Sequence, residues 1–177
     1  MENNSILTVS SPFRFKTLFT KPLKYIIQIF TWDKSEHAAG YCKGIVSNTS
    51  GEGFKRIDFD KWMKQYAIND AIIHEYYPPT PFTKEQEDKM IEFDDLSIKA
   101  GKDYGAVDAS ITVLDEIKPI RELLIKLGYK PRGILCSQQR FVALCYAGIF
   151  PYQDDTLSPA ELKEKLLKAG WKVRRVN

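Results

Sequence analysis

The sequence predicts an α+β fold, with strands gathered in the middle of the chain and helices on either side. Runs typical of strands, which alternate or are rich in β-branched and aromatic residues, occupy residues 38–47, 54–59 and 71–77. Helical patterns, from apolar spacing or start and stop signals, occupy residues 13–31, 84–99, 137–146 and 159–168. The two patterns follow one another without a repeat, so a single sheet with flanking helices is the expected architecture.

The first half of the chain combines one helix with a hairpin. Apolar residues from Phe13 to Thr31 have helical spacing, and Pro22 marks a start or a kink. Residues 38–47 read as a strand that ends in the turn-rich segment 48–53. Residues 54–59 alternate and are the expected hairpin partner.

Capping residues define the helices that follow. Asp58 or Asp60 is positioned to cap a short helix through Trp62 and Tyr66. After the strand at 71–77, Thr83 opens a helix with acidic residues in its first turn, and this helix continues to about Lys99.

The second half is expected to be mainly helical. Residues 104–127 are mixed and helical in their second half, and a helix follows at about 137–146. Pro159 in a first turn opens the last helix, which ends at Gly170. The basic residues 172–175 are interpreted as a solvated end.

Size and composition narrow the function classes. With 177 residues the chain is close to the size of one domain, and we expect a flexible arm over residues 1–12 and a single domain over residues 13–177. A net charge of +3 does not indicate nucleic-acid binding. Three cysteines without a CxxC pair and only two histidines predict neither a disulfide framework nor a structural zinc site, and no metal or organic cofactor is expected.

The N-terminus shows no signal peptide, and the apolar stretch at 23–32 is far too short to span a bilayer. We therefore expect a cytoplasmic protein, or one that another route delivers or packages, for example into a virion.

Cys136 is the candidate nucleophile because it follows an apolar pair at the start of a predicted helix. Free N–H groups and partial positive charge at a helix N-terminus stabilise a thiolate. Burial as a small apolar residue is the competing interpretation for any cysteine, and it is the one we give to Cys42 and Cys145.

A nucleophilic cysteine needs a base, and the sequence offers His37 and His74. His37 precedes the small residues Ala38, Ala39 and Gly40, which leave room for a substrate and for an incoming helix. His74 lies inside an ordinary strand-like run. A structural role is the alternative for both histidines.

Four segments of the chain resemble, in order, those of the circularly permuted NlpC-type hydrolases, a papain-like group that includes the YiiX-like proteins. Residues 31–39, TWDKSEHAA, resemble a family segment that contains "SH". Residues 100–105, AGKDYG, resemble a "G-x-x-Y" segment. Residues 135–138, LCSQ, resemble the "CSE" nucleophile segment. Residues 157–162, LSPAEL, resemble the "(S/T)-P-x-D-L" end.

This resemblance implies a papain-like central antiparallel sheet flanked by helices, with Cys136 as nucleophile and His37 as base. It places a polar residue on the strand after the histidine to orient the imidazole, and the best register puts Asn48 there, with Glu52 as the alternative. A turn role is the competing interpretation of Asn48. Tyr104 and Gln138 become candidates for lining the substrate or oxyanion site. The extra Glu36 before His37, and Gln138 where the family has glutamate, are departures from the pattern.

The function implied is hydrolysis of an amide bond through an acyl-cysteine intermediate, in a peptide or a peptidoglycan stem peptide. Two alternatives stay open. One is a lipid-acting acyl hydrolase or acyltransferase of the permuted group. The other is a structural or binding protein that keeps the fold without catalysis.

Overall fold

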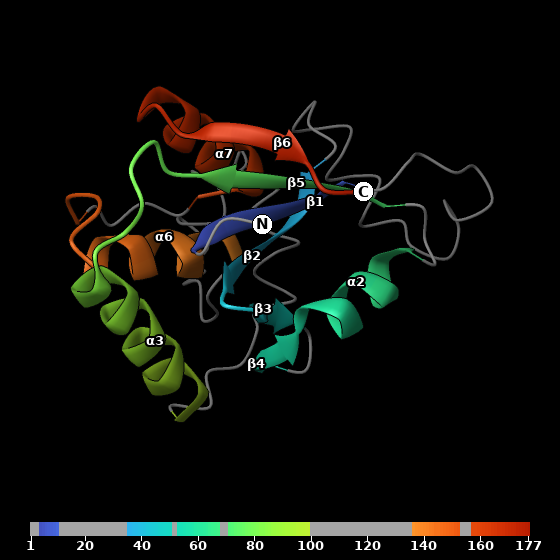
Figure 1. Ribbon diagram of the computed structural model, residues 1–177, viewed down its shortest axis with the longest axis horizontal. Helices are drawn as coiled ribbons and strands as arrows, with labels where there is room; N and C mark the ends of the chain where they lie inside the picture. Colours follow the sequence, from blue (N-terminus) through green and yellow to red (C-terminus); the bar gives the residue numbers. More distant parts are fainter. Residues whose placement is uncertain (1–3, 11–34, 51–52, 68–70, 100–135, 153–156) are drawn as a thin grey trace, which may run out of the picture.

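The computed structural model of the chain describes residues 4–10, 35–50, 53–67, 71–99, 136–152 and 157–177. Within these residues the protein has a mixed α+β structure, with a six-stranded antiparallel sheet and four helices (Figure 1). The predicted α+β class is confirmed at this level. The helix expected at 13–31 and the mixed segment at 104–127 lie outside the described residues.

The sheet has the strand order β4-β3-β2-β1-β5-β6, and every neighbouring pair is antiparallel. In chain order the strands are β1 (Ser5–Ser10), β2 (Ser35–Cys42), β3 (Ile45–Ser50), β4 (Gly53–Asp58), β5 (Ile72–Tyr77) and β6 (Lys172–Arg175). The helices are α2 (Phe59–Ala67), α3 (Lys84–Lys99), α6 (Cys136–Tyr146) and α7 (Pro159–Lys168).

The expectation of a flexible N-terminal arm over residues 1–12 is wrong for residues 5–10. These residues form β1, a central strand that pairs with β2 on one side and β5 on the other. All six residues of the strand are buried. Successive side chains of a strand point to opposite faces of the sheet. Accordingly, Ile6 belongs to one hydrophobic core, and Leu7 and Val9 belong to the other.

The single strand expected at 38–47 is also corrected, because the chain turns inside it. Lys43 and Gly44 both have positive φ angles, 48° and 84°, and the two-residue turn joins β2 to β3. The consequence for function is that Asn48 lies in β3, paired with Lys55 of β4. The pairing of β3 with β4 fixes the position of Asn48, and the turn interpretation of this residue is wrong.

Two hydrophobic cores lie on opposite faces of the sheet. The α6 core packs α6 and α7 against the sheet through residues that include Ala38, Phe141, Leu144, Leu162 and Leu166. The α2 core packs Trp62 of α2 against the other face, with Leu7, Val9, Ala39, Val46, Ala71 and Ile73. Figure 1 shows α2 well apart from α3, α6 and α7.

The start signals predicted for three helices are confirmed. The Asp58 carboxylate accepts from the Lys61 backbone N–H at 3.1 Å, at the start of α2. Thr83 and Gln86 exchange backbone and side-chain hydrogen bonds at the start of α3. Ser158 forms a capping box with Glu161, and Pro159 is in the first turn of α7.

Residues 172–175 are not merely a solvated end. They form β6, the edge strand beside β5, although their side chains stay exposed. Arg174 reaches back to Glu75, a fully buried carboxylate, with Nε 2.7 Å from Oε2. None of the described helices has both the length and the apolar character needed to cross a membrane.

Candidate functional site

The structure brings together three of the residues singled out from the sequence: Cys136, His37 and Asn48. His37 lies near the start of β2, Asn48 lies in the adjacent strand β3, and Cys136 is the first residue of α6. Helix α6 packs on β2, so the N-terminus of the helix lies against the strand that carries His37.

A β-bulge sets the position of His37. In the ladder between β1 and β2, Val9 pairs with His37 but the next residue, Ser10, pairs with Ser35. Glu36 is therefore an extra residue in β2, and it is the same residue that separates this segment from the "SH" of the permuted hydrolases. Bulges bend a strand and re-aim its side chains, and they are frequent beside active sites.

The His37 imidazole contacts a polar side chain through one of its ring nitrogens. Its Nε2 lies 2.6 Å from Oδ1 of Asn48, and the same oxygen accepts a 3.0 Å hydrogen bond from Nε1 of Trp62. Asn48 and Trp62 are buried, whereas His37 is half-buried. Tyr66 lies parallel to the His37 ring, with 6.2 Å between centroids and 17° between planes.

Cys136 is buried, and its surroundings favour the thiolate. Burial alone raises the pKa of the thiol, but the charge of His37 and a side-chain hydrogen bond from it lower the pKa, and so do the backbone N–H groups of Ala38 and Ser137. The lowering contributions outweigh burial, so the pKa of Cys136 lies below its ordinary value.

The pKa of His37 moves in the opposite direction. Burial lowers it and the charge of Arg140 also lowers it, but the Cys136 thiolate and the hydrogen bonds to Cys136 and Asn48 raise it more. The result is a pKa above the ordinary value for histidine. Both shifts are in the direction that favours a thiolate beside an imidazolium.

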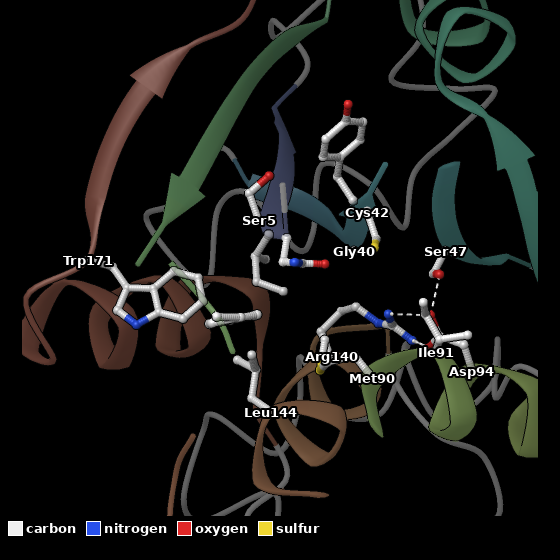
Figure 2. A pocket seen from close by; sticks show the side chains of 14 residues that line it. Ser5, Gly40, Cys42, Ser47, Met90, Ile91, Asp94, Arg140, Leu144 and Trp171 are labelled. Carbon is white, nitrogen blue, oxygen red and sulfur yellow. Dashed lines mark hydrogen bonds and ion pairs between the residues drawn. The ribbon is translucent and has the colours of Figure 1, made fainter. Parts of the chain in front are cut away.

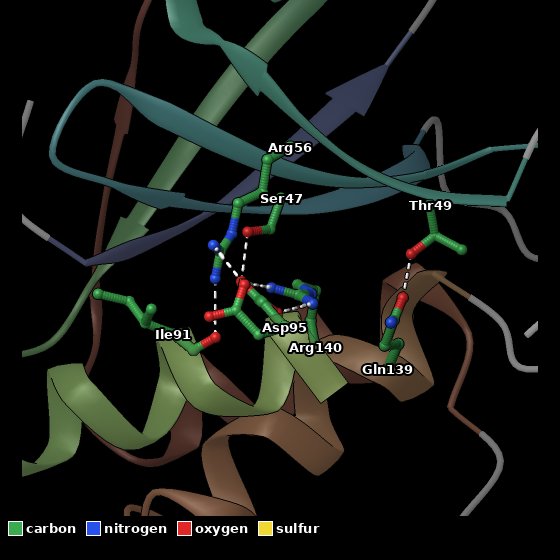
Figure 3. A network of polar contacts seen from close by, with 8 residues as sticks. Ser47, Thr49, Arg56, Ile91, Asp95, Gln139 and Arg140 are labelled. Atoms are coloured by element: carbon green, nitrogen blue, oxygen red, sulfur yellow. Dashed lines mark hydrogen bonds and ion pairs between the residues drawn. The ribbon is translucent and has the colours of Figure 1, made fainter. Parts of the chain in front are cut away.

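Buried polar contacts beside Asn48 fix α6 against the sheet (Figure 3). Thr49 donates to the side-chain oxygen of Gln139 in α6. Ser47 donates to Asp94 in α3, and the same carboxylate binds Arg140 in α6, with Nη2 2.7 Å from Oδ1. The residues on either side of Asn48 are thus both tied, directly or through Asp94, to the helix that carries Cys136.

Sequence reasoning missed these contacts and the Trp62 contact. Gln139 and Arg140 lie three and four residues after Cys136, the spacing that places side chains on one face of a helix. That spacing was a usable signal. The partners on β3 and α3 gave no comparable signal, because they are distant in sequence.

Arg140 is a buried charge near the site, with 1% of its side chain exposed. Its guanidinium lies 5.1 Å from the ring centroid of Phe54. It also lies over Gly40 of β2, where a Cβ atom would stand 2.5 Å from Nη1. A glycine at position 40 is therefore what lets Arg140 lie between the sheet and Asp94.

A small cavity lies beyond Arg140, between β1, β2 and α3, and Trp171 lies at its far end (Figure 2). Its volume of about 20 Å³ is enough for roughly one water molecule. Neither Cys136 nor His37 lines it. This cavity is thus separate from the Cys136 thiol and is too small for a substrate.

The other candidates have different positions. Gln138 lies in the first turn of α6 and is half-buried. Cys42 closes β2 at the end opposite His37, and Cys145 donates to the Pro151 carbonyl at 3.4 Å. His74 lies in β5, with β1 between it and β2. Tyr104 and Glu52 lie outside the described residues.

The described residues contain no cluster of three or more metal-ligating side chains. Comparison of the chain with protein-family models, with curated proteins and with solved structures gives no match.

Proposed function

We propose that this protein is a papain-like cysteine hydrolase that cleaves an amide bond through an acyl-cysteine intermediate. One observation carries the proposal: a continuous chain of contacts leads from the Cys136 sulfur through the His37 imidazole to the Asn48 amide oxygen. A nucleophile, a base within hydrogen-bond reach and a third group that orients the base are the parts that such catalysis needs.

Cys136 serves as the nucleophile in its thiolate form. The first turn of a helix offers backbone N–H groups and partial positive charge, and the N–H groups of Ala38 and Ser137 already stabilise the sulfur. The sulfur attacks the carbonyl carbon of the substrate and forms a tetrahedral intermediate. N–H groups at the helix N-terminus are suited to stabilise the oxyanion of that intermediate.

His37 transfers the proton in both halves of the reaction. As an imidazolium it protonates the leaving amine when the carbon–nitrogen bond breaks, which leaves the acyl group on Cys136. As a neutral imidazole it then takes a proton from water, and the hydroxide formed attacks the acyl carbon. The carbon–sulfur bond breaks, the acid product leaves, and the thiolate of Cys136 and the imidazolium of His37 are restored. The Asn48 oxygen accepts a hydrogen bond from Nε2–H throughout and keeps the other ring nitrogen toward the sulfur.

The order of these residues supports assignment to the permuted NlpC-type group. The histidine and the third residue come from adjacent antiparallel strands and precede the cysteine, which opens a later helix. The four resembling segments have the same order. A peptide, including a peptidoglycan stem peptide, is the substrate class that this kinship favours.

The first experiment measures alkylation of each cysteine by iodoacetamide between about pH 5 and pH 9, read by mass spectrometry. Cys42 and Cys145 are internal controls in the same molecule. The proposal expects Cys136 to label fastest at mildly acidic pH, and His37→Ala to abolish that advantage. Equal labelling of all three cysteines would exclude a catalytic dyad.

A substrate test follows with stem-peptide fragments and, separately, with acyl esters. A covalent acyl adduct on Cys136 that is absent from Cys136→Ala identifies the bond class. Turnover of esters without turnover of any peptide would replace the amidase assignment by an acyl-ester hydrolase. If neither class acylates a fast-labelling Cys136, amide and ester hydrolysis of these substrates is excluded.

A further inference from the structure

The Asn48 amide oxygen has two nitrogen neighbours, and one of them can only donate. Trp62 Nε1 lies 3.0 Å from Oδ1, and His37 Nε2 lies 2.6 Å from the same atom. An indole nitrogen always carries a proton and never accepts. The atom that faces Trp62 must therefore be the amide oxygen, and His37 Nε2 must carry a proton when it meets that oxygen.

We propose that Trp62 is a positioning residue that holds the Asn48 amide with its oxygen toward His37 and thereby selects the Nε2–H tautomer of the imidazole. This inference deepens the proposed function and rests on it for its catalytic consequence. With Nε2 protonated, Nδ1 is the nitrogen left to exchange a proton with Cys136. In the opposite tautomer, Nδ1 carries the proton and has no lone pair for the thiol.

The setting of Trp62 suits this role. It is fully buried in the α2 core, on a short helix capped by Asp58. Tyr66, one turn further along α2, packs on the indole with 4.7 Å between centroids and also lies parallel to His37. The indole is thus packed on several sides, and this packing keeps its N–H directed at the Asn48 oxygen.

Without the indole N–H, an asparagine amide can turn over by half a rotation of its terminal bond. The –NH₂ group would then face His37 and would donate to Nε2. Nε2 would become the acceptor, and the proton would move to Nδ1, the ring nitrogen that faces the sulfur. Within the described part of the chain, the Trp62 hydrogen bond is the contact that opposes this rotation directly.

The direct test reads the tautomer by the ¹⁵N shifts of the imidazole. The chain has only two histidines, so His74→Gln assigns the signals. Measurement at about pH 8 in a Cys136→Ser background keeps the ring neutral, because a hydroxyl does not ionise there and free histidine has a pKa of about 6.5. We expect the Nε2–H form with Trp62 and a shift toward Nδ1–H in Trp62→Phe.

The functional test compares alkylation of Cys136 with and without the indole. Trp62→Phe should slow labelling at pH 6 about tenfold, which corresponds to a rise of about one unit in the thiol pKa. Trp171→Phe is the matched control. It makes the same change at another buried tryptophan, which packs on Phe82 in the α6 core, and it should leave the labelling rate unchanged.

An Asn48→Asp background separates orientation from packing. A carboxylate presents oxygen whichever way it rotates, so the effect of Trp62→Phe should be much smaller there than in the wild type. If Trp62→Phe does not fold, judged by circular dichroism, benzothienylalanine at position 62 keeps the ring size and removes the N–H.

The outcomes are distinct. An unchanged tautomer on loss of the indole N–H overturns the inference. An equal loss of labelling in the wild-type and Asn48→Asp backgrounds overturns it as well. If Cys136 never labels faster than Cys42 or Cys145, the proposed function fails, while the tautomer measurement still decides the role of Trp62.

Discussion

Nε2 of His37 lies 2.6 Å from Oδ1 of Asn48 at a point that the backbone ladder between their strands does not reach. The pairs between β2 and β3 run from Gly40 and Ser47 to Cys42 and Ile45, and His37 is three residues before the first of them. The side-chain contact therefore bridges the two strands where backbone pairing is absent. Loss of the Asn48 side chain should therefore affect His37 without breaking the sheet.

The first prediction concerns Asn48→Leu, which keeps a side chain of similar size and removes the acceptor. The imidazolium of His37 loses the hydrogen bond that stabilises it, so the pKa of His37 should fall. Alkylation of Cys136 at pH 6 should slow by about tenfold or more, equivalent to at least one pKa unit.

Thr49→Val provides the control for that change. It removes a buried hydroxyl one residue away, which bonds to Gln139 and not to His37. Thr49→Val should lower the free energy of unfolding by about 1 kcal/mol, the usual contribution of one hydrogen bond. It should leave the pH dependence of Cys136 alkylation unchanged. A profile altered equally by both variants would mean that Asn48 acts only through packing.

The second prediction is the pH dependence of the stability contributed by the Cys136–His37 pair. In the proposed thiolate–imidazolium pair the folded state holds one proton, on His37, and the raised pKa of His37 and the lowered pKa of Cys136 both favour this form. In the unfolded chain the two groups titrate near about 6.5 and about 8.5. Between these values both states hold one proton on the pair, so its contribution does not vary with pH.

Outside that window the contribution declines. Below about pH 6.5 the unfolded histidine binds a further proton, and the stabilisation is lost as pH falls through the folded pKa of Cys136. Above about pH 8.5 the unfolded thiol ionises, and the stabilisation is lost as pH rises through the folded pKa of His37. The difference in free energy of unfolding between wild type and Cys136→Ser should show this plateau, and a difference independent of pH would contradict it.

Several parts of this architecture were predictable because their signals are local. Asp58 or Asp60, Thr83 and the first-turn Pro159 predicted three helix starts, and the helical pattern after Cys136 predicted α6. The position of Asn48 as the third residue came from the resemblance alone, and the structure places its oxygen against His37.

The missed features depend on partners that are distant in the sequence. Residues 5–10 were interpreted as part of a loose arm. This segment forms a strand because it pairs with β2 on one side and β5 on the other, and a local sequence pattern does not reveal such partners. The burial of Arg140 was not predicted. Its burial depends on Asp94, forty-six positions earlier, and on the absence of a side chain at Gly40.

The third prediction contrasts two adjacent acidic residues of α3. Asp94 pairs with Arg140, whose side chain is 1% exposed, whereas Asp95 pairs with Arg56 at the surface, with 60% and 30% of the two side chains exposed. Asp94→Ala leaves a buried guanidinium without its counter-charge and should cost about 3–5 kcal/mol. Asp95→Ala should cost less than about 1 kcal/mol.

Urea denaturation of the two variants measures this difference directly. A double change, Asp94→Leu with Arg140→Met, removes both charges and should recover much of the loss, because no unpaired charge stays buried. If Asp94→Ala and Asp95→Ala cost the same, the pair between α3 and α6 is not a buried one in solution.

The last prediction tests the close approach of Arg140 to β2. A Cβ at position 40 would lie 2.5 Å from Nη1 and 3.3 Å from Cδ of Arg140, so Gly40→Ala must displace the guanidinium. The displacement weakens the bond to Asp94 and should cost about 1–3 kcal/mol, the usual range for overpacking a core. Because both changes act on Arg140, Gly40→Ala combined with Arg140→Met should cost clearly less than the sum of the two single changes. A thermodynamic cycle of the four proteins measures this coupling. Strict additivity would show that Gly40 is required by the strand itself and not by the arginine over it.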